Sequence, residues 1–273
     1  MPVTSLYVEG NLETELLTPV LQGSPLLRQG GSKNSLKPRA IRERLENKVN
    51  SGYLRDRDFD FDPPSDLSNL VIDGIHQGVA YGWRWCRHEI ENYLIDPAIV
   101  TEAMNWAIEE YENAIRQVAV RIKSYEAARW TVGIIRRALP PNYELNTRPD
   151  GLNEIDLPQA IDTISVNSWA HQNIENYQKP LVSITSPIAV QSSFDAILAR
   201  FNDEFVSDVR NTLVWFSGKD ILAGLREWLA TKVSVRFNPG AFRASLRDWI
   251  RSNPDRTLKL IPEWKSMIDT VRA

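Results

Sequence analysis

Hydrophobic positions in the first ninety residues follow two different spacings. Three short apolar runs are bounded by glycine or polar residues, which predicts strands. These runs are residues 4–10, 24–33 and 50–58. The segments between them, residues 11–23 and 35–49, place apolar side chains three and four positions apart and predict helices. A weaker fourth strand is predicted at 82–88, after a loop rich in proline, aspartate and serine. Alternating strands and helices predict an α/β fold with a parallel sheet flanked by helices.

The pattern changes after Asp96. An aspartate followed by proline suits a helix start, because the carboxylate caps the helix and proline fits its first position. Apolar residues then recur at helical spacing as far as Ile122, which predicts one long helix, and residues 126–139 predict a second. The same spacing returns at 192–213, 219–233 and 240–253. Residues 140–187 predict no regular element. The chain therefore divides at residue 96 into an α/β region and a mainly α-helical C-terminal region.

The composition narrows the classes of function. Among 273 residues, 32 Lys+Arg and 35 Asp+Glu give a net charge of −3, which argues against a general nucleic-acid coat or a membrane-surface protein. The single cysteine, Cys86, excludes an internal disulfide framework and favours a reducing, cytoplasmic location. We find neither a signal peptide nor an apolar run of about 20 residues, so we expect no membrane partner.

Acidic side chains follow the first and fourth predicted strands. Glu9 ends the first strand, and Glu13 lies one helical turn further along the chain. Glu89 and Glu91 follow the fourth strand. Because ligands bind beyond the carboxyl ends of parallel strands, these side chains are expected at one rim of the sheet. Each could equally be a structural or exposed acid. The neighbouring His88 is most simply a satisfied polar residue, and we assign it no metal.

The segment GYLRDRDFDFDPP adds a further carboxylate pair at the end of the third strand. If this segment is extended, Asp56 and Asp58 point to the same side, because side chains alternate along a strand. Such a pair commonly holds Mg²⁺, a cation that prefers oxygen ligands. The alternative is a solvated edge strand whose charges prevent aggregation. Asp60 and Asp62 run into two prolines and are interpreted as loop residues.

Two glycine turns lead into basic side chains. Lys219 follows Gly218 at the start of a predicted helix, where backbone N–H groups favour phosphate. Gly30 and Gly31 precede three basic residues that could face a nucleic-acid backbone, namely Lys33, Lys37 and Arg39. Neither turn has the spacing of a P-loop. Simple solvent exposure explains both sets equally well.

Four short motifs in this order resemble the Toprim domain, the metal-dependent catalytic module of topoisomerases, primases and OLD-family nucleases. They are LYVEGNLE, RDRDFD, HEIENYL and SGKDIL. They are most similar to a Toprim-related family often encoded beside an ABC-type ATPase, which includes the Toprim effector of the PARIS anti-phage system. The resemblance implies a Toprim-like catalytic core at residues 1–96. The helical region, residues 97–273, would also contribute Lys219 to the site.

The resemblance implies a role for each of these residues. Glu9 and Lys219 match catalytic positions, Glu9 as an acid/base or metal-binding glutamate. The implied metal ligands are Glu9, Glu13, Asp56, Asp58, Glu89 and Glu91, and they would hold one or two Mg²⁺ or Mn²⁺ ions. One departure is Asn11–Leu12, where many relatives carry an aspartate close to the glycine.

The implied function is that of a metal-dependent endonuclease that hydrolyses RNA, such as a tRNA, or DNA. It would be a toxic effector of anti-phage defence, controlled by a separate ABC- or AAA-type ATPase, and a homodimer is compatible with activation by release. The alternative is a non-catalytic Toprim-like interaction module bound to an ATPase scaffold. Cleavage that depends on a divalent metal would separate the two.

Overall fold

The computed structural model describes residues 2–139, 163–232 and 238–273. The chain forms two compact units. The first contains Met1–Glu126 and Phe201–Ala273, and the second contains Ala127–Arg200. Every residue implicated above in chemistry belongs to the first unit. The predicted division at residue 96 stays a prediction.

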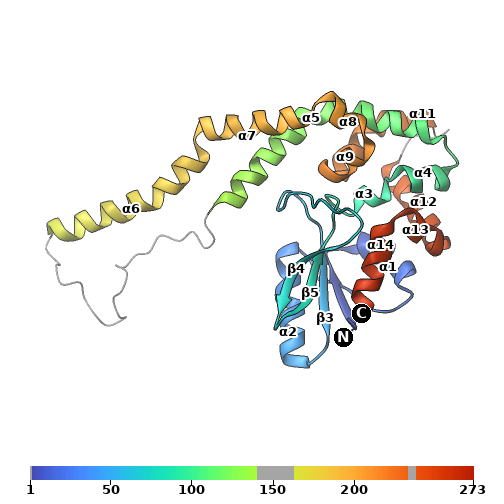
Figure 1. Ribbon diagram of the computed structural model, residues 1–273, viewed down its shortest axis with the longest axis horizontal. Helices are drawn as coiled ribbons and strands as arrows, with labels where there is room; N and C mark the ends of the chain where they lie inside the picture. The colour runs from blue at the N-terminus through green and yellow to red at the C-terminus, as the bar shows by residue number, and fades with distance from the viewer. Residues whose placement is uncertain (1, 140–162, 233–237) are drawn as a thin grey trace. The chain divides into compact units, whose positions relative to one another are not determined.

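A five-stranded sheet lies in the first unit, with strand order β2-β1-β3-β5-β4 (Figure 1). Its strands are β1 (Ser5–Val8), β2 (Leu26–Gln29), β3 (Ser51–Arg55), β4 (Val71–His76) and β5 (Val79–Arg84). β1 pairs in parallel with β2 and β3, and β3 pairs in parallel with β5. The edge strand β4 is antiparallel to β5 and was not predicted. The predicted α/β class, with a mostly parallel sheet and a helical C-terminal region, is confirmed.

Helices cover both faces of this sheet (Figure 1). α2 (Lys33–Asn47) packs its Leu36 against Tyr53 and Tyr81 of the sheet. α1 (Asn11–Leu21) buries four apolar side chains, as its helical spacing predicts. The last helix, α14 (Pro262–Arg272), is fastened to the start of the chain, since the Val3 N–H donates to the Val271 carbonyl at 2.8 Å.

The long helix predicted from Pro97 is interrupted. The chain forms a short α3 (Glu91–Leu94), then α4 (Pro97–Met104), and then α5 (Ile108–Ala138). Asn105 ends α4 with a left-handed backbone (φ 54°), a conformation that asparagine tolerates better than most residues. The prediction of an unbroken helix through residue 122 is therefore wrong. The helix predicted at 126–139 is the second half of α5.

The helix predicted at 240–253 is confirmed, whereas those predicted at 192–213 and 219–233 are each divided into shorter helices. The remaining helices are α6 (Thr163–Thr185), α7 (Pro187–Arg200), α8 (Asp203–Ser207), α9 (Val209–Trp215), α10 (Gly218–Gly224), α11 (Arg226–Lys232), α12 (Pro239–Ser252) and α13 (Pro254–Leu260). The helix predicted at 192–213 is divided because Asn202 and Asp208 cap new helices with their side chains. α6 lies where no element was predicted, and residues 140–162 lie outside the described chain.

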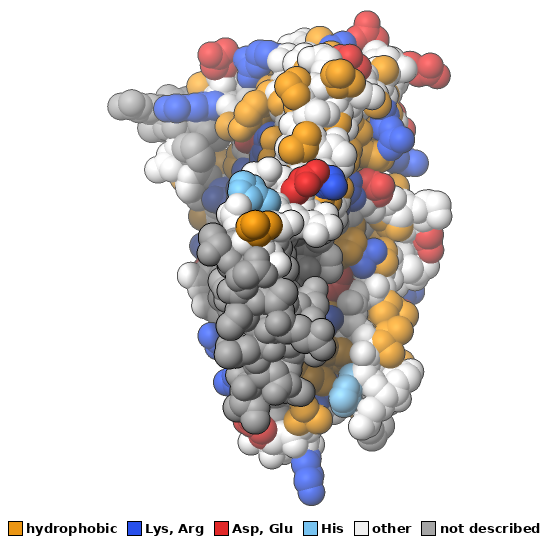
Figure 2. Space-filling view, turned by 90° about the vertical axis from the view of Figure 1, so that its left-hand side faces the viewer, with side chains coloured by type: hydrophobic (Ala, Val, Ile, Leu, Met, Phe, Trp, Pro, Cys, Tyr) orange, Lys and Arg blue, Asp and Glu red, His pale blue; other side chains and the backbone are white. Residues whose placement is uncertain are grey.

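Residues Ala170–Arg200, in the second unit, are long and apolar enough to cross a membrane by length and composition. This stretch was not predicted from the sequence, because prolines, serines and threonines interrupt its apolar residues. On the face drawn in Figure 2, hydrophobic side chains lie in separate groups among charged and polar ones. One stretch of this kind is weak evidence for a membrane span. The absence of a membrane partner and the cytoplasmic location stay predictions.

Candidate metal centre

Three loops meet at the carboxyl ends of β1, β3 and β5. Glu9 directly follows β1, and Asp56 directly follows β3. The Asp56 N–H donates a hydrogen bond to Glu9 Oε1 at 3.1 Å. Asp56 Oδ1 in turn accepts the N–H of Ile90, in the loop after β5, at 3.0 Å. The carboxylates of one loop thus bind the backbone of the next. This is the rim at which the parallel topology predicted a ligand site.

Three of the six predicted metal ligands form one compact group. Asp56, Glu89 and Glu91 are all buried, and each offers a carboxylate oxygen within 4.8 Å of the others. Among the described residues, the buried Oε2 of Glu91 has no hydrogen-bond partner, although it lies 3.3 Å from the ammonium of Lys219. Buried carboxylates this close together need a cation or protons to offset their repulsion. The group therefore could hold a metal ion.

A cleft of about 320 Å³ opens beside this group. The acidic and basic side chains that line it are Glu9, Glu13, Asp56, Glu91 and Lys219. Glu9 and Glu13 thus share the cleft with Asp56 and Glu91 without belonging to the compact group. Glu13 also accepts the N–H of Gly10 at 3.2 Å, which fixes it at the start of α1. Five of the six predicted acidic ligands therefore either line this cleft or belong to the compact group.

Burial makes these carboxyl groups reluctant to ionise. The pKa of Glu9 is raised from 4.5 to about 7, mainly by burial and then by the nearby Asp58 and Glu13 charges, against the lowering effect of the Asp56 N–H. Burial also raises the pKa of Asp56 well above its usual value, with Glu13 and Glu9 as the next causes. The pKa values of Glu13 and Glu91 are raised for the same first reason, burial. Near neutral pH the metal-free site therefore retains protons.

Lys219 reaches the group from a distant part of the sequence. Its backbone N–H donates to Glu89 Oε1 at 2.8 Å, and its ammonium donates to Glu89 Oε2 at 2.5 Å. Ser217, the N-cap of α10, donates its hydroxyl to the same Oε1 at 2.8 Å. Burial lowers the pKa of Lys219, but the Glu89 and Glu91 carboxylates outweigh it and raise the pKa overall. The predicted proximity of Lys219 to the acidic residues is present in the structure.

A glycine allows α10 to approach α3 this closely. A Cβ on Gly218 would lie 2.7 Å from the backbone nitrogen of Asn92 and 2.9 Å from the carbonyl carbon of Glu91. Any side chain at this position would therefore push the two helix starts apart. The side-chain amide of Asn92 reinforces the contact by donating to the Phe216 carbonyl at 2.9 Å. The glycine before Lys219 thus has a steric role as well as the turn-forming role that the sequence indicated.

Asp56 and Asp58 do not lie on a common strand. β3 ends at Arg55, and Asp58 adopts a left-handed backbone with φ of 49°, so the chain turns between the two aspartates. The predicted extended pair is therefore wrong in its geometry, because only an uninterrupted strand would direct both to one side. Asp58 instead pairs with the Lys33 ammonium at 2.8 Å, and Asp60 pairs with the same ammonium at 2.7 Å.

Two arginines support the site and were not identified from the sequence. The wholly buried Arg57 donates to the carbonyls of Cys86 and Val214, at 3.0 and 2.5 Å, and so joins the loops after β3 and β5 to α9. Arg243 of α12 donates to Glu91 Oε1 at 2.9 Å. Arginines alternating with aspartates look like surface charges in a sequence. Nothing in the spacing of Arg243 indicated that α12 would face the rim.

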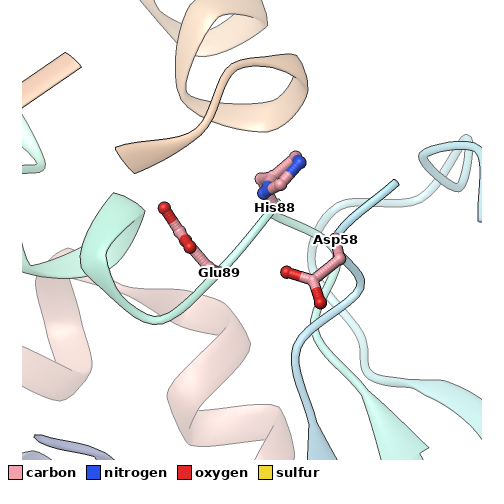
Figure 3. A group of neighbouring side chains, drawn as sticks. All are labelled: Asp58, His88 and Glu89. Atoms are coloured by element: carbon pink, nitrogen blue, oxygen red, sulfur yellow. The ribbon is translucent and has the colours of Figure 1, made fainter. Parts of the chain in front are cut away.

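A second group combines carboxylates with an imidazole. Asp58, His88 and Glu89 each offer a ligand atom within 4.8 Å of the others, and Figure 3 shows the three side chains on two neighbouring loops. His88 was assigned no metal from the sequence.

The three predicted nucleic-acid contacts differ in how free their charges are to meet a ligand. Lys33 is ion-paired with Asp58 and Asp60, whereas Lys37 and Arg39 are exposed on α2.

No protein-family model matches the chain, and no curated protein sequence matches it. Buried carboxylates with an adjoining ammonium group at a sheet rim can bind a divalent cation. With that cation in place, the lysine and arginine side chains can face an anionic ligand.

Proposed function

We propose that the chain is a divalent-metal-dependent nuclease with a Toprim-like core. The observation that carries this proposal is the compact group of Asp56, Glu89 and Glu91 beside Lys219 at the carboxyl rim of the sheet. The order of motifs along the chain supports it, since each of the four motifs contributes a residue to this rim. Hard oxygen ligands favour Mg²⁺ or Mn²⁺ as the cofactor, with one or two ions bound.

The residues around the cleft have different roles in the proposed phosphodiester hydrolysis. A bound divalent ion supplies a Lewis acid for the phosphate and lowers the pKa of a coordinated water. Glu9, whose pKa burial raises to about 7, can accept a proton near neutral pH, where a general base is most effective. The Lys219 ammonium and the Arg243 guanidinium, which now pair with Glu89 and Glu91, would turn to the phosphoryl oxygens if those carboxylates held an ion instead.

RNA is the proposed substrate, with tRNA as the first candidate, and DNA is the alternative. The proposed setting is anti-phage defence, in which a separate ABC- or AAA-type ATPase holds the chain inactive and releases it, with homodimerisation on release. These points rest on the resemblance of the motifs to the Toprim effector of the PARIS system.

A cleavage assay tests the proposal. The purified chain is incubated with labelled tRNA and with plasmid DNA in Mg²⁺, in Mn²⁺ and in EDTA. We expect cleavage that requires the metal and that is lost in Asp56→Asn. The matched control is Glu46→Gln, an exposed acid on α2 that should cleave normally. The absence of cleavage under every metal condition, including after release from a co-purifying ATPase, would instead favour the non-catalytic interaction module.

A further inference from the structure

His88 is buried next to Glu89 in the loop after β5, and its imidazole adds a nitrogen to a set of ligands that is otherwise all oxygen. The imidazole is 1% exposed and lies with Asp58 and Glu89, each offering a ligand atom within 4.8 Å of the others (Figure 3). The chain contains only three histidines. A buried imidazole grouped with two carboxylates is therefore a distinctive feature of this molecule.

The backbone on both sides of this group is held in place. The Asp58 N–H donates to the His88 carbonyl at 2.8 Å, which joins the loops after β3 and β5 directly. The Phe59 ring meets the imidazole edge to face, with ring centroids 4.3 Å apart. The Glu89 N–H donates to Asn92 Oδ1 at 3.0 Å. The three side chains thus start from a fixed backbone, which lowers the cost of ordering them around an ion.

Glu89 belongs to both groups, and this links them. We propose that Asp58, His88 and Glu89 form a second cation position, which takes a transition metal such as Mn²⁺ or Co²⁺ and is bridged to the first position by the Glu89 carboxylate. An imidazole nitrogen suits transition metals, whereas Mg²⁺ prefers oxygen ligands throughout. The proposal rests on the metal-binding part of the proposed function and is independent of whether the chain cleaves nucleic acid.

Binding at the second position requires Asp58 to exchange its present partner. The Lys33 ammonium pairs with Asp58 at 2.8 Å and with Asp60 at 2.7 Å. When a metal takes the Asp58 carboxylate, Lys33 retains Asp60, so its charge keeps a partner. Glu89 likewise gives up the Lys219 ammonium, whose side chain is already 60% exposed and can turn to solvent or to a ligand. Neither lysine is left as an unpaired buried charge.

The test counts metal ions on the full-length chain. Free Mn²⁺ is measured by electron paramagnetic resonance during titration at pH 7.5, with the wild type, His88→Asn and the control His76→Asn on β4. We expect two Mn²⁺ per chain in the wild type and in His76→Asn, and one in His88→Asn. Excess Mg²⁺ should displace only one of the two. Pulsed measurements should show nitrogen coupling from an imidazole, and this coupling should be lost in His88→Asn alone.

A second variant guards against a folding defect at the buried histidine. Asp58→Asn changes a partly exposed side chain and should also bind one Mn²⁺, with an unchanged circular dichroism spectrum. One Mn²⁺ on the wild type, or two on folded His88→Asn, would overturn the second position. Cleavage is scored separately in Mg²⁺. A chain that binds two Mn²⁺ but cleaves nothing would refute the nuclease, whereas an active chain with one Mn²⁺ would refute only this inference.

Discussion

Replacing Glu9 with glutamine should stabilise the metal-free protein above neutral pH. Burial, followed by the charges of Asp58 and Glu13, raises the pKa of Glu9 from 4.5 to about 7. A raised carboxyl pKa contributes stability that is fully present below pH 4.5 and is lost as the pH rises through about 7. Glutamine never ionises, and its side-chain oxygen can still accept the Asp56 N–H. The substitution therefore removes the penalty and keeps the hydrogen bond.

The size of the gain follows from the two pKa values. A difference between 4.5 and about 7 corresponds to roughly 3 kcal/mol in the free energy of unfolding, at about 1.4 kcal/mol per pH unit. Glu9 is only partly buried, so solvent screening reduces this value. We expect a gain of about 1–2 kcal/mol at pH 8 and a much smaller one at pH 5.

Urea unfolding in EDTA, followed by tryptophan fluorescence, measures this gain at both pH values. Glu46→Gln, an exposed substitution on α2, is the control and should change stability little at either pH. Adding Mn²⁺ should then stabilise the wild type more than Glu9→Gln, because the metal favours the ionised site. Equal shifts at pH 5 and pH 8, or a loss of stability at pH 8, would refute the view that ionising the partly buried Glu9 destabilises the protein.

Three further substitutions test the surroundings of the metal group. Lys219→Ala leaves the buried Glu89 carboxylate without its ammonium partner, so the free energy of unfolding should fall by about 1–2 kcal/mol and cleavage should be lost. Unchanged activity would exclude a catalytic role for the lysine. Arg243→Ala removes a partly exposed guanidinium, so it should weaken substrate binding, seen as a raised KM, with little change in melting temperature; an unchanged KM would argue against phosphate contact. Gly218→Ala places a Cβ 2.7 Å from the Asn92 nitrogen, so it should lower the free energy of unfolding by about 1–3 kcal/mol and weaken Mn²⁺ binding. Wild-type metal affinity would contradict the close approach of α10.

The sheet could be predicted as far as local patterns determine it. The first five elements follow from alternating apolar runs and helical spacing, and they are confirmed. The β4–β5 hairpin was missed although its turn is visible in the sequence. Gln77 and Gly78 both have positive φ, at 49° and 77°, and a glycine at such a turn between two apolar runs is a hairpin signal. The helix breaks at Asn105 and Asn202 were missed because apolar spacing continues across them.

The site was predictable where topology alone places residues. Glu9, Asp56 and Glu89 follow parallel strands, and such strands end at a common rim. Long-range packing decided the rest. The left-handed turn at Asp58 separates the two aspartates, and no periodic pattern encodes it. Arg243 reaches Glu91 only because α12 packs against the core. The sequence of an amphipathic helix does not indicate which residue its polar side chains will contact.

The most direct test of the central claim is an anomalous diffraction map from crystals of the chain grown with Mn²⁺. We predict an anomalous peak among the carboxylate oxygens of Asp56, Glu89 and Glu91, at metal–oxygen distances of about 2.0–2.3 Å, with the Lys219 ammonium moved away from Glu89. No peak at this position at millimolar Mn²⁺, with Lys219 still paired to Glu89, would contradict the assignment of a metal centre.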